Sequence, residues 1–197
     1  MFITLEGIDG SGKTTQAELL SKALGPDTVM AREPGGTEAS ERIRELVADP
    51  KLELDPVAEL LLFCAARAQL VTQVIRPAIA DGRDVVCDRF SDSTAAYQGA
   101  ARGVSVERAV SVNELATGGL RPDVTVLLRI EPQRAAERAT PGDDRFEREG
   151  VDFQRQVASG YEQIAKRDSN RVAVVDAEGS VEEVHARVME AVEGARE

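Results

Sequence analysis

Hydrophobic residues along the chain fall into two alternating patterns. Short, nearly continuous apolar runs occupy residues 1–6, 28–32, 84–87, 123–130 and 171–176. Runs of this length, bounded by turn residues, predict buried strands. Between them apolar residues recur every three or four positions, as Ala17, Leu20 and Leu24 do, which predicts amphipathic helices. Alternating strands and helices are typical of a sheet covered on both faces, so we expect a three-layer α/β fold with a five-stranded parallel sheet.

Polar residues mark where several helices begin. Asp55 followed by Pro56 is typical of a capped helix start, and Ser180 with Glu183 has the spacing of a capping box. The helix from residue 56 is expected to kink near Pro77. Further helices are expected over residues 13–24, 94–101 and 105–117, around 43–47 and 153–164, and after Pro132. Because no repeat or linker interrupts the alternation, residues 1–197 are expected to form one domain.

A glycine-rich segment follows the first predicted strand. Residues 7–14, Gly-Ile-Asp-Gly-Ser-Gly-Lys-Thr, fit the pattern G-x-x-x-x-G-K-[ST]. Glycines allow the backbone to wrap a polyphosphate, so that N–H groups and the helix N-terminus point at negative charge. Lys13 would reach the β- and γ-phosphates, and the Thr14 hydroxyl would help to hold Mg²⁺. The flanking strand and helix favour this interpretation over an ordinary glycine-rich helix start, and predict a nucleoside triphosphate site on a P-loop NTPase-type fold.

Charge narrows the range of partners. The 197 residues include 24 basic and 35 acidic side chains, a net charge of −11, which disfavours a nucleic-acid partner because such a partner requires a basic face. Lysines are only four: Lys13, Lys22, Lys51 and Lys166. Acidic excess with few lysines suits a salt-rich cytoplasm, and an acidic protein from an ordinary cytoplasm is the alternative.

Other compositional features point to a soluble, cytoplasmic protein. The chain has no N-terminal signal pattern and no uninterrupted apolar run of 18 residues, so no membrane partner is expected. Cys64 and Cys87 lie in apolar stretches and are expected to be reduced core residues. Together with the single His185 they are too few for a zinc site.

The remaining motifs distinguish among triphosphate-binding proteins. An Asn-Lys-x-Asp box for guanine is absent, because neither Asn113 nor Asn170 precedes a lysine. In parallel sheets ligands gather at the carboxyl ends of the strands. Here Arg32 and Arg89 stand at or just after two such ends. A short P-loop chain with arginines at strand ends indicates phosphoryl transfer to a small anionic acceptor.

At these positions the sequence resembles the bacterial-type thymidylate kinase family. Besides the P-loop, the resemblance rests on residues 32–36 (Arg-Glu-Pro-Gly-Gly), 62–67 (Leu-Phe-Cys-Ala-Ala-Arg), 88–90, 97–99, 102–103, 119–123 and 144–145. It covers essentially the whole chain in order. One departure is Phe90, where the family more often has Tyr or His. Another branch places arginine where Gly10 stands, and the family pattern then implies that the lid supplies the charge through Arg145.

The resemblance implies a donor side and a catalytic set. ATP would be bound by Gly7, Ile8, Asp9, Gly10, Ser11, Gly12, Lys13, Thr14, Thr15 and Arg138. Thr14 and Asp88 would hold Mg²⁺, and Lys13, Asp88, Arg89 and Arg145 would be catalytic. A polar lid over about residues 139–150 would close to exclude water.

On the acceptor side the resemblance implies binding of dTMP by Asp9, Arg32, Phe63, Arg67, Arg89, Ser93, Thr94, Tyr97 and Gln98. Phe63 would stack on thymine. Arg67, four residues further along the helix, would donate to a thymine carbonyl, and Gln98 would meet the pyrimidine edge. Tyr97 would crowd the 2′ position of the sugar. Core packing or solvated surface is the alternative for each of these side chains.

The implied reaction converts dTMP and MgATP to dTDP and ADP. The acceptor phosphate is mostly dianionic near neutral pH, so it needs no general base, and catalysis consists of positioning and charge neutralisation. The alternatives are a kinase for another nucleoside monophosphate and a non-catalytic ATP-binding regulator. The family commonly forms homodimers, and the helix from residue 56 offers an apolar face for one.

Overall fold

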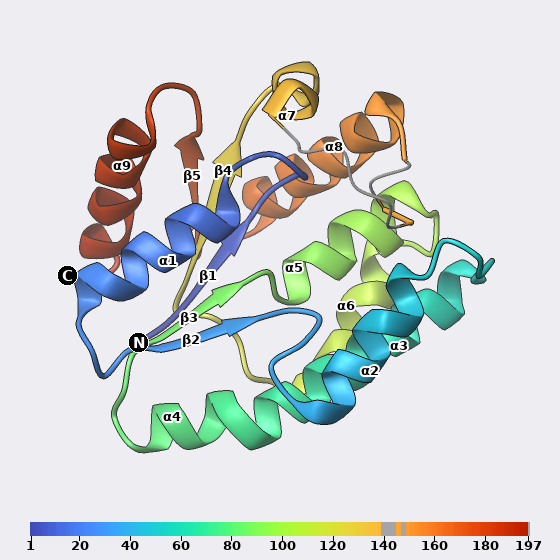
Figure 1. The fold of residues 1–197 in the computed structure, drawn as a ribbon, viewed down its shortest axis with the longest axis horizontal. Coiled ribbons are helices and arrows are strands. Elements are labelled where there is room, and N and C mark those ends of the chain that lie inside the picture. The colour runs from blue at the N-terminus through green and yellow to red at the C-terminus, as the bar shows by residue number, and fades with distance from the viewer. Residues whose placement is uncertain (139–144, 147–148, 197) are drawn as a thin grey trace.

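One parallel sheet organises the protein in the computed structural model (Figure 1), which describes residues 1–138, 145–146 and 149–196. Its strands are β1 (Phe2–Glu6), β2 (Val29–Arg32), β3 (Val85–Asp88), β4 (Val124–Arg129) and β5 (Val172–Asp176). They lie side by side in the order β2-β3-β1-β4-β5. All four neighbouring pairs are parallel. The predicted α/β fold with a five-stranded parallel sheet is confirmed.

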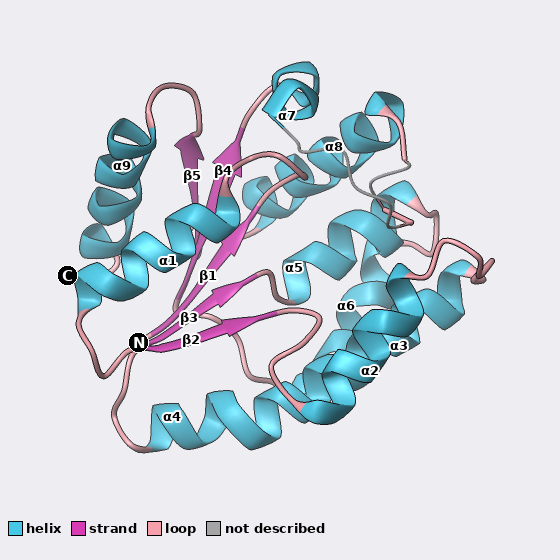
Figure 2. Ribbon diagram, viewed as in Figure 1, coloured by secondary structure: helices cyan, strands magenta, loops and turns pink. Residues whose placement is uncertain are grey.

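Helices lie on both sides of this sheet (Figure 2). On one side are α1 (Lys13–Leu24) and α9 (Val181–Gly194), which pack against each other. The other side carries α3 (Pro56–Leu70), α5 (Ser91–Thr94), α6 (Val106–Thr117) and α8 (Val151–Arg167). Of the remaining helices, α2 (Glu38–Ala48) packs on α3, and α7 (Pro132–Arg138) follows β4. The predicted caps form: Asp55 accepts from the N–H groups of Val57 and Ala58, and Ser180 with Glu183 forms the capping box.

The central strand β1 determines where polar groups meet. All five of its residues are buried, which is expected for a strand with neighbours on both sides and helices on both faces. Leu5 stands opposite Asp88 of β3, and Glu6 stands opposite Leu127 of β4. The register therefore brings Glu6 and Asp88 to the same carboxyl edge of the sheet, from which the P-loop also departs.

Two helices contain wide, π-helical turns. The stretch from Pro56 to Ala80 runs through α3, the π-helical η1 (Val71–Ile75) and α4 (Arg76–Ala80). This wide turn lies just before Pro77, near which a kink was expected. A second π-helical segment, η2 (Ala95–Ala101), continues α5.

The Pro56–Ala80 stretch is apolar on average. It is 25 residues long and contains an 18-residue window with a mean hydropathy of 1.4, enough by length and composition alone to cross a membrane. Glu59, Arg67 and Arg76 interrupt its apolar run. Leu70 and Ile75 are fully buried against β1, β2 and β3, as in the core helix of a globular domain.

Candidate active site

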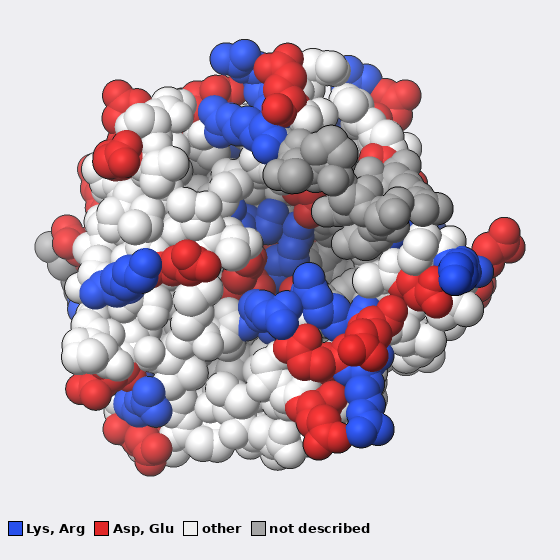
Figure 3. All heavy atoms as spheres, in the orientation of Figure 1, with Lys and Arg blue, Asp and Glu red and all other residues white. Residues whose placement is uncertain are grey.

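A cavity of about 870 Å³ opens at the carboxyl edge of the sheet. Its described lining contains more basic than acidic side chains, although the chain as a whole is acidic. The basic ones are Lys13, Arg32, Arg44, Arg89 and Arg138, and the acidic ones are Asp9, Glu33 and Asp88. Figure 3 shows blue basic side chains gathered in the hollow at the centre of this face. A positive hollow in a protein of net charge −11 favours an anionic ligand at this position.

The P-loop forms one wall of the cavity. Gly10 and Gly12 have φ angles of 78° and 90°, a left-handed conformation that glycine adopts without strain. A Cβ atom at position 10 would lie 2.2 Å from the carbonyl oxygen of Ala135 in α7. An arginine at position 10, as in the other branch of the family, would therefore require α7 to move. The α1 N-terminus starts directly at Lys13 and presents its free N–H groups to the cavity.

Lys13 is held inside this loop. Its Nζ donates to the carbonyl oxygen of Ile8 at 2.7 Å, and only 6% of the residue is exposed. Burial, followed by the repulsion of Arg89, lowers the pKa of Lys13 to about 8. A polyphosphate beside the ammonium group would favour its charged form.

Thr14 and Asp88 meet between the P-loop and the end of β3. The Thr14 hydroxyl donates to Asp88 Oδ2 at 2.6 Å. The other oxygen, Asp88 Oδ1, is buried without a hydrogen-bond partner. An unpartnered carboxylate oxygen beside a hydroxyl fits a hard cation such as Mg²⁺, which takes oxygen ligands and commonly binds through one or two carboxylates plus substrate phosphates. No group of three or more His, Cys, Asp or Glu residues able to hold a metal occurs in the described part of the chain.

Arg89 follows Asp88 in a strained backbone conformation. Its φ is 69°, which is uncommon for a residue with a side chain. The buried carboxylate of Glu6 supports this turn because it accepts from the backbone N–H groups of Phe90 at 2.8 Å and Ser93 at 3.2 Å. Burial and the nearby Asp92 raise the pKa of Glu6.

The side chain of Arg89 reaches back across the cavity to the P-loop. Its guanidinium pairs with the carboxylate of Asp9 and lies over the ring of Tyr97, whose hydroxyl also donates to Asp9 at 3.1 Å. Burial alone would raise the pKa of Asp9, but Arg89 and Lys13 outweigh it and hold this pKa below its usual value. Gln154 of α8 adds a further donor to Asp9 at 3.0 Å. Residues distant in sequence thus converge on the P-loop aspartate.

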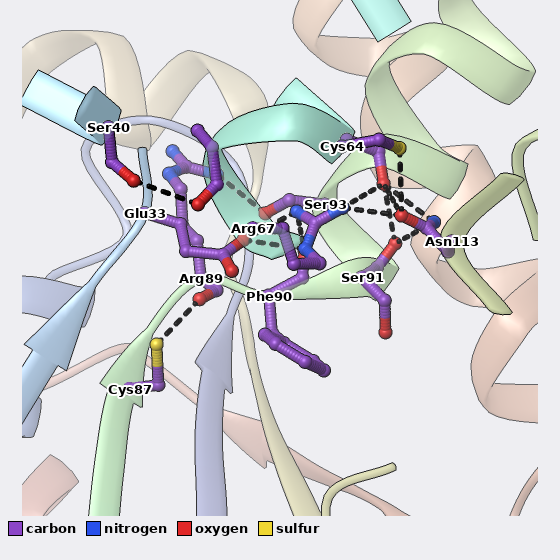
Figure 4. Close-up of polar contacts among 12 residues, drawn as sticks. Glu33, Ser40, Cys64, Arg67, Cys87, Arg89, Phe90, Ser91, Ser93 and Asn113 are labelled. Carbon is purple, nitrogen blue, oxygen red and sulfur yellow. Dashed lines mark hydrogen bonds and ion pairs between the residues drawn. The ribbon is translucent and has the colours of Figure 1, made fainter. Parts of the chain in front are cut away.

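Arg67 lies just behind the cavity wall in a dense polar cluster (Figure 4). The residue is 1% exposed. Its guanidinium donates through Nε and Nη2 to Glu33, through Nη1 to Thr94 and Asn113, and through Nη2 to the carbonyl oxygen of Phe90. These contacts use all five N–H groups of the guanidinium. Burial raises the pKa of Glu33 to about 7, although Arg67 opposes the shift.

Phe63 and Gln98 reach the cavity from α3 and η2. Phe63 makes an edge contact with Phe146 at 5.7 Å between ring centroids. Gln98 donates from Nε2 to Oε1 of Glu59, a fully buried carboxylate, at 2.6 Å. The guanidinium of Arg145 binds the other oxygen of Glu59, and its Nε donates to the carbonyl oxygen of Val47 at 3.1 Å.

Most of the residues predicted for the site line this one cavity. They are Asp9, Gly10, Ser11, Gly12, Lys13, Thr14, Thr15, Arg32, Phe63, Asp88, Arg89, Ser93, Thr94, Tyr97, Gln98 and Arg138. Gly7, Ile8, Arg67 and Arg145 do not line it. Arg32 is half exposed and paired with Glu41 at 2.8 Å, and Arg138 donates to the carbonyl oxygen of Ala177 at 2.9 Å. The predicted lid falls largely on residues 139–144 and 147–148, which lie outside the described residues.

Sequence reasoning missed the acidic and amide side chains that hold these residues in place. Glu6, Glu59, Asn113 and Gln154 support the site, and Arg44 lines the cavity. A signal existed for Glu6 and Glu59, since each interrupts an otherwise apolar segment. A carboxylate in such a position is seldom fully buried unless it is paired.

The fold and the cavity define a P-loop kinase of small anionic substrates. The sequence model of the thymidylate kinase family matches residues 5–188. Similar proteins include thymidylate kinases of Deinococcus radiodurans, 45% identical over 98% of this chain and 96% of the relative, and of Pelotomaculum thermopropionicum, 47% identical over 98% and 92%. The crystal structure of thymidylate kinase from Ehrlichia chaffeensis is 34% identical, covers 98% of both chains and has a TM-score of 0.82.

The chain belongs to the thymidylate kinase family. It is a phosphotransferase that uses ATP to phosphorylate dTMP to dTDP, and the family, enzyme class and reaction predicted from the sequence are confirmed. The alternatives of another monophosphate kinase and of a regulator are not favoured.

Proposed function

We propose that the cavity binds ATP along the P-loop and dTMP along the wall formed by α3, α5 and η2, and that Thr14 and Asp88 would hold Mg²⁺. One observation carries this proposal: Lys13 and Arg89 line the same cavity from the P-loop and from the end of β3. A lysine in a P-loop suits the β- and γ-phosphates, whereas an arginine suits bidentate binding of a second phosphate. The transferred phosphoryl group would pass between these two cations.

The chemistry of this arrangement is charge neutralisation and alignment. An oxygen of the dianionic dTMP phosphate attacks the γ-phosphorus of ATP while the bond to the β-phosphate oxygen breaks and ADP leaves. The attacking oxygen carries no proton, so no general base is needed. Lys13 and Arg89 reduce the repulsion between the two anionic substrates, and Asp9 orients Arg89. Thr14 and Asp88 would hold Mg²⁺, since an otherwise unpartnered oxygen of Asp88 lies beside the Thr14 hydroxyl. When bound, the ion would neutralise part of the negative charge that develops on the transferred phosphoryl group. Backbone N–H groups of residues 7–15 and Arg138 complete the proposed ATP site.

Recognition of dTMP is proposed to divide among four sets of side chains. Phe63 stacks on the base while Gln98 meets its edge, and Tyr97 limits the space for a 2′-hydroxyl. Arg32, Ser93 and Thr94 complete the acceptor wall. Arg67 is proposed to donate to a thymine carbonyl, and this requires one of its five contacts to be exchanged for the base.

Arg145 is proposed as the catalytic arginine that Gly10 does not provide. It is bound to Glu59 and to the carbonyl oxygen of Val47, outside the lining of the cavity, so a catalytic role requires it to leave both partners. Arg145→Ala should then lower kcat far more than it raises the KM for ATP. An unchanged kcat with only a raised KM would contradict the catalytic role.

The assembly and location of the protein stay proposals. Val57 and Leu61 are 48% and 52% exposed on the outer side of α3, and they could form the contact of a homodimer. Leu61→Glu should reduce a dimer mass to that of a monomer in light scattering, and a monomeric parent would contradict the idea. We further propose a single kinase domain over residues 1–197 in the cytoplasm, with a lid near 139–150. A net charge of −11 disfavours nucleic acid as a partner.

A coupled assay with several monophosphates tests the proposed site. With ATP and Mg²⁺, kcat/KM for dTMP should exceed that for dCMP, dGMP and dAMP by orders of magnitude. Activity should disappear with EDTA and return with excess Mg²⁺. Arg89→Ala should lose most turnover while the protein stays folded, measured by circular dichroism. A folded variant with turnover near that of the parent would remove Arg89 from the catalytic set.

A further inference from the structure

Glu59 is a buried carboxylate that contacts Gln98 of the acceptor wall as well as the proposed catalytic arginine, Arg145. It lies on α3 and is 0% exposed. Its Oε1 accepts from Gln98 Nε2 at 2.6 Å and from Arg102 Nε at 3.4 Å, and its Oε2 binds the guanidinium of Arg145. Two arginines therefore compensate its charge, as a carboxylate removed from water requires.

This pairing fixes which end of the Gln98 amide faces the cavity. An ionised carboxylate is an acceptor only, so the amide nitrogen of Gln98 must be the atom directed at Glu59. Gln98 Oε1 has no partner in the described part of the protein, and it is not among the enclosed polar atoms that lack one. Because Gln98 lines the cavity, its Oε1 opens onto that space as a hydrogen-bond acceptor.

We infer that Glu59 is a positioning residue for base selection: it holds Gln98 with its carbonyl oxygen toward the base, so that the site takes bases with an N–H donor at N3. This inference rests on the proposed contact between Gln98 and the pyrimidine edge. Thymine and uracil carry a donor at N3 flanked by acceptors. Cytosine carries an acceptor at N3 next to an amino group, so its N3 would face the Gln98 oxygen without a hydrogen.

The mechanism predicts what happens when the carboxylate becomes an amide. A glutamine at position 59 has nearly the same shape but offers both a donor and an acceptor, so either orientation of Gln98 is satisfied. The amide nitrogen of Gln98 is then able to face the base and to donate to cytosine N3. Discrimination against dCMP should fall, whereas that between dTMP and dUMP should not, because the latter pair differ only in a methyl group.

Ratios of kcat/KM for dTMP, dCMP and dUMP, each set measured on one preparation, provide the test. Such ratios do not depend on how much of the preparation is folded. In Glu59→Gln the dTMP/dCMP ratio should fall by about tenfold or more, with the dTMP/dUMP ratio within about twofold of the parent. The double variant Glu59→Gln with Gln98→Leu should match Gln98→Leu alone, because Glu59 acts through Gln98.

A second buried carboxylate provides the matched control. Glu6→Gln alters the support of Arg89 on the phosphate side, so it should lower kcat and leave the dTMP/dCMP ratio unchanged. If Glu59→Gln leaves that ratio unchanged while Gln98→Leu lowers it, the inference about Glu59 is wrong. An unchanged ratio in Gln98→Leu overturns both the inference and the proposed contact of Gln98 with the base.

Discussion

The two halves of the cavity that we propose for ATP, the donor, and for dTMP, the acceptor, are built in different ways. The proposed donor half is mainly one continuous segment, residues 7–15, with backbone N–H groups, glycine conformations and one lysine, and Arg138 adds a side chain from α7. The acceptor half gathers side chains from α3, α5, η2 and the end of β3. There the polar side chains are paired with carboxylates: Arg89 with Asp9, Arg67 with Glu33, and Gln98 with Glu59.

This difference implies different responses to substitution. A backbone N–H group survives most side-chain changes, so the donor half should depend on few residues. In the acceptor half, removal of one partner leaves the other buried and unpaired, which is destabilising as well as inactivating. Substitutions in the donor half should therefore lower activity with little loss of stability, whereas substitutions in the acceptor half should lower both.

The largest expected effect is on the donor side. Lys13→Ala should lower kcat by about 10³-fold, because charge on the transferred phosphoryl group loses its P-loop cation. The melting temperature should hardly change, since burial already opposes the charge of Lys13. Steady-state kinetics and thermal denaturation of the same sample measure both quantities. A large loss of stability would show that the lysine also holds the loop together.

In the acceptor half, a substitution should cause a large loss of stability. Arg67→Met removes the cation that compensates Glu33 and is expected to destabilise the fold by about 3–5 kcal/mol. Urea denaturation measures the free energy of unfolding. The double variant Arg67→Met with Glu33→Gln should recover much of the loss, because no buried charge is then left unpaired. A single variant as stable as the parent would contradict the paired design of this half.

A smaller effect is expected for ATP binding in alkaline solution, where the Kd for ATP should increase about tenfold per pH unit. The pKa of Lys13 is about 8 before ATP binds, so the ammonium group loses its proton as the pH rises through 8. The Kd for ATP should be constant below that value and increase above it, and binding near pH 8 should take up protons. Calorimetry in buffers of different ionisation enthalpy detects both effects. Lys13→Met serves as the control and should show neither.

The smallest expected effect concerns the sugar. Tyr97→Ala opens space beside Asp9 and should favour the ribonucleotide. The ratio of kcat/KM for ribothymidine monophosphate to that for dTMP should rise by about fivefold. Tyr97→Phe keeps the ring but loses the hydroxyl contact with Asp9, so it should leave the ratio nearly unchanged. Equal ratios in the parent protein and in both variants would assign Tyr97 to core packing.

The same contrast explains what the sequence could predict. The P-loop is local, so its residue types and spacing indicate its chemistry directly, and α1 begins and ends where the apolar spacing places it. The five parallel strands were accessible too, because their apolar runs alternate with helical spacing. Glu6 and Glu59 stand out because each interrupts an apolar segment, but their partners were not accessible, since Glu59 meets Gln98 and Glu6 meets Phe90 only through tertiary packing. The wide turn before Pro77 was missed because apolar periodicity does not distinguish α- from π-helical turns.

The π-helical segment η2 makes part of the acceptor wall depend on residue count. The backbone N–H of Arg102 bonds to the carbonyl oxygen of Tyr97, five residues earlier, at 2.8 Å. Within this widened turn both Tyr97 and Gln98 face the cavity, while Gly99 packs so closely on Val106 that a Cβ atom would lie 3.0 Å from its Cα. Deleting one residue, such as Ala100, would restore an ordinary α-helical turn and rotate one of the two side chains away. If Tyr97 and Gln98 select the substrate as proposed, substrate choice depends partly on the number of residues in this helix, and a deletion that leaves every polar group of the site intact should still alter it.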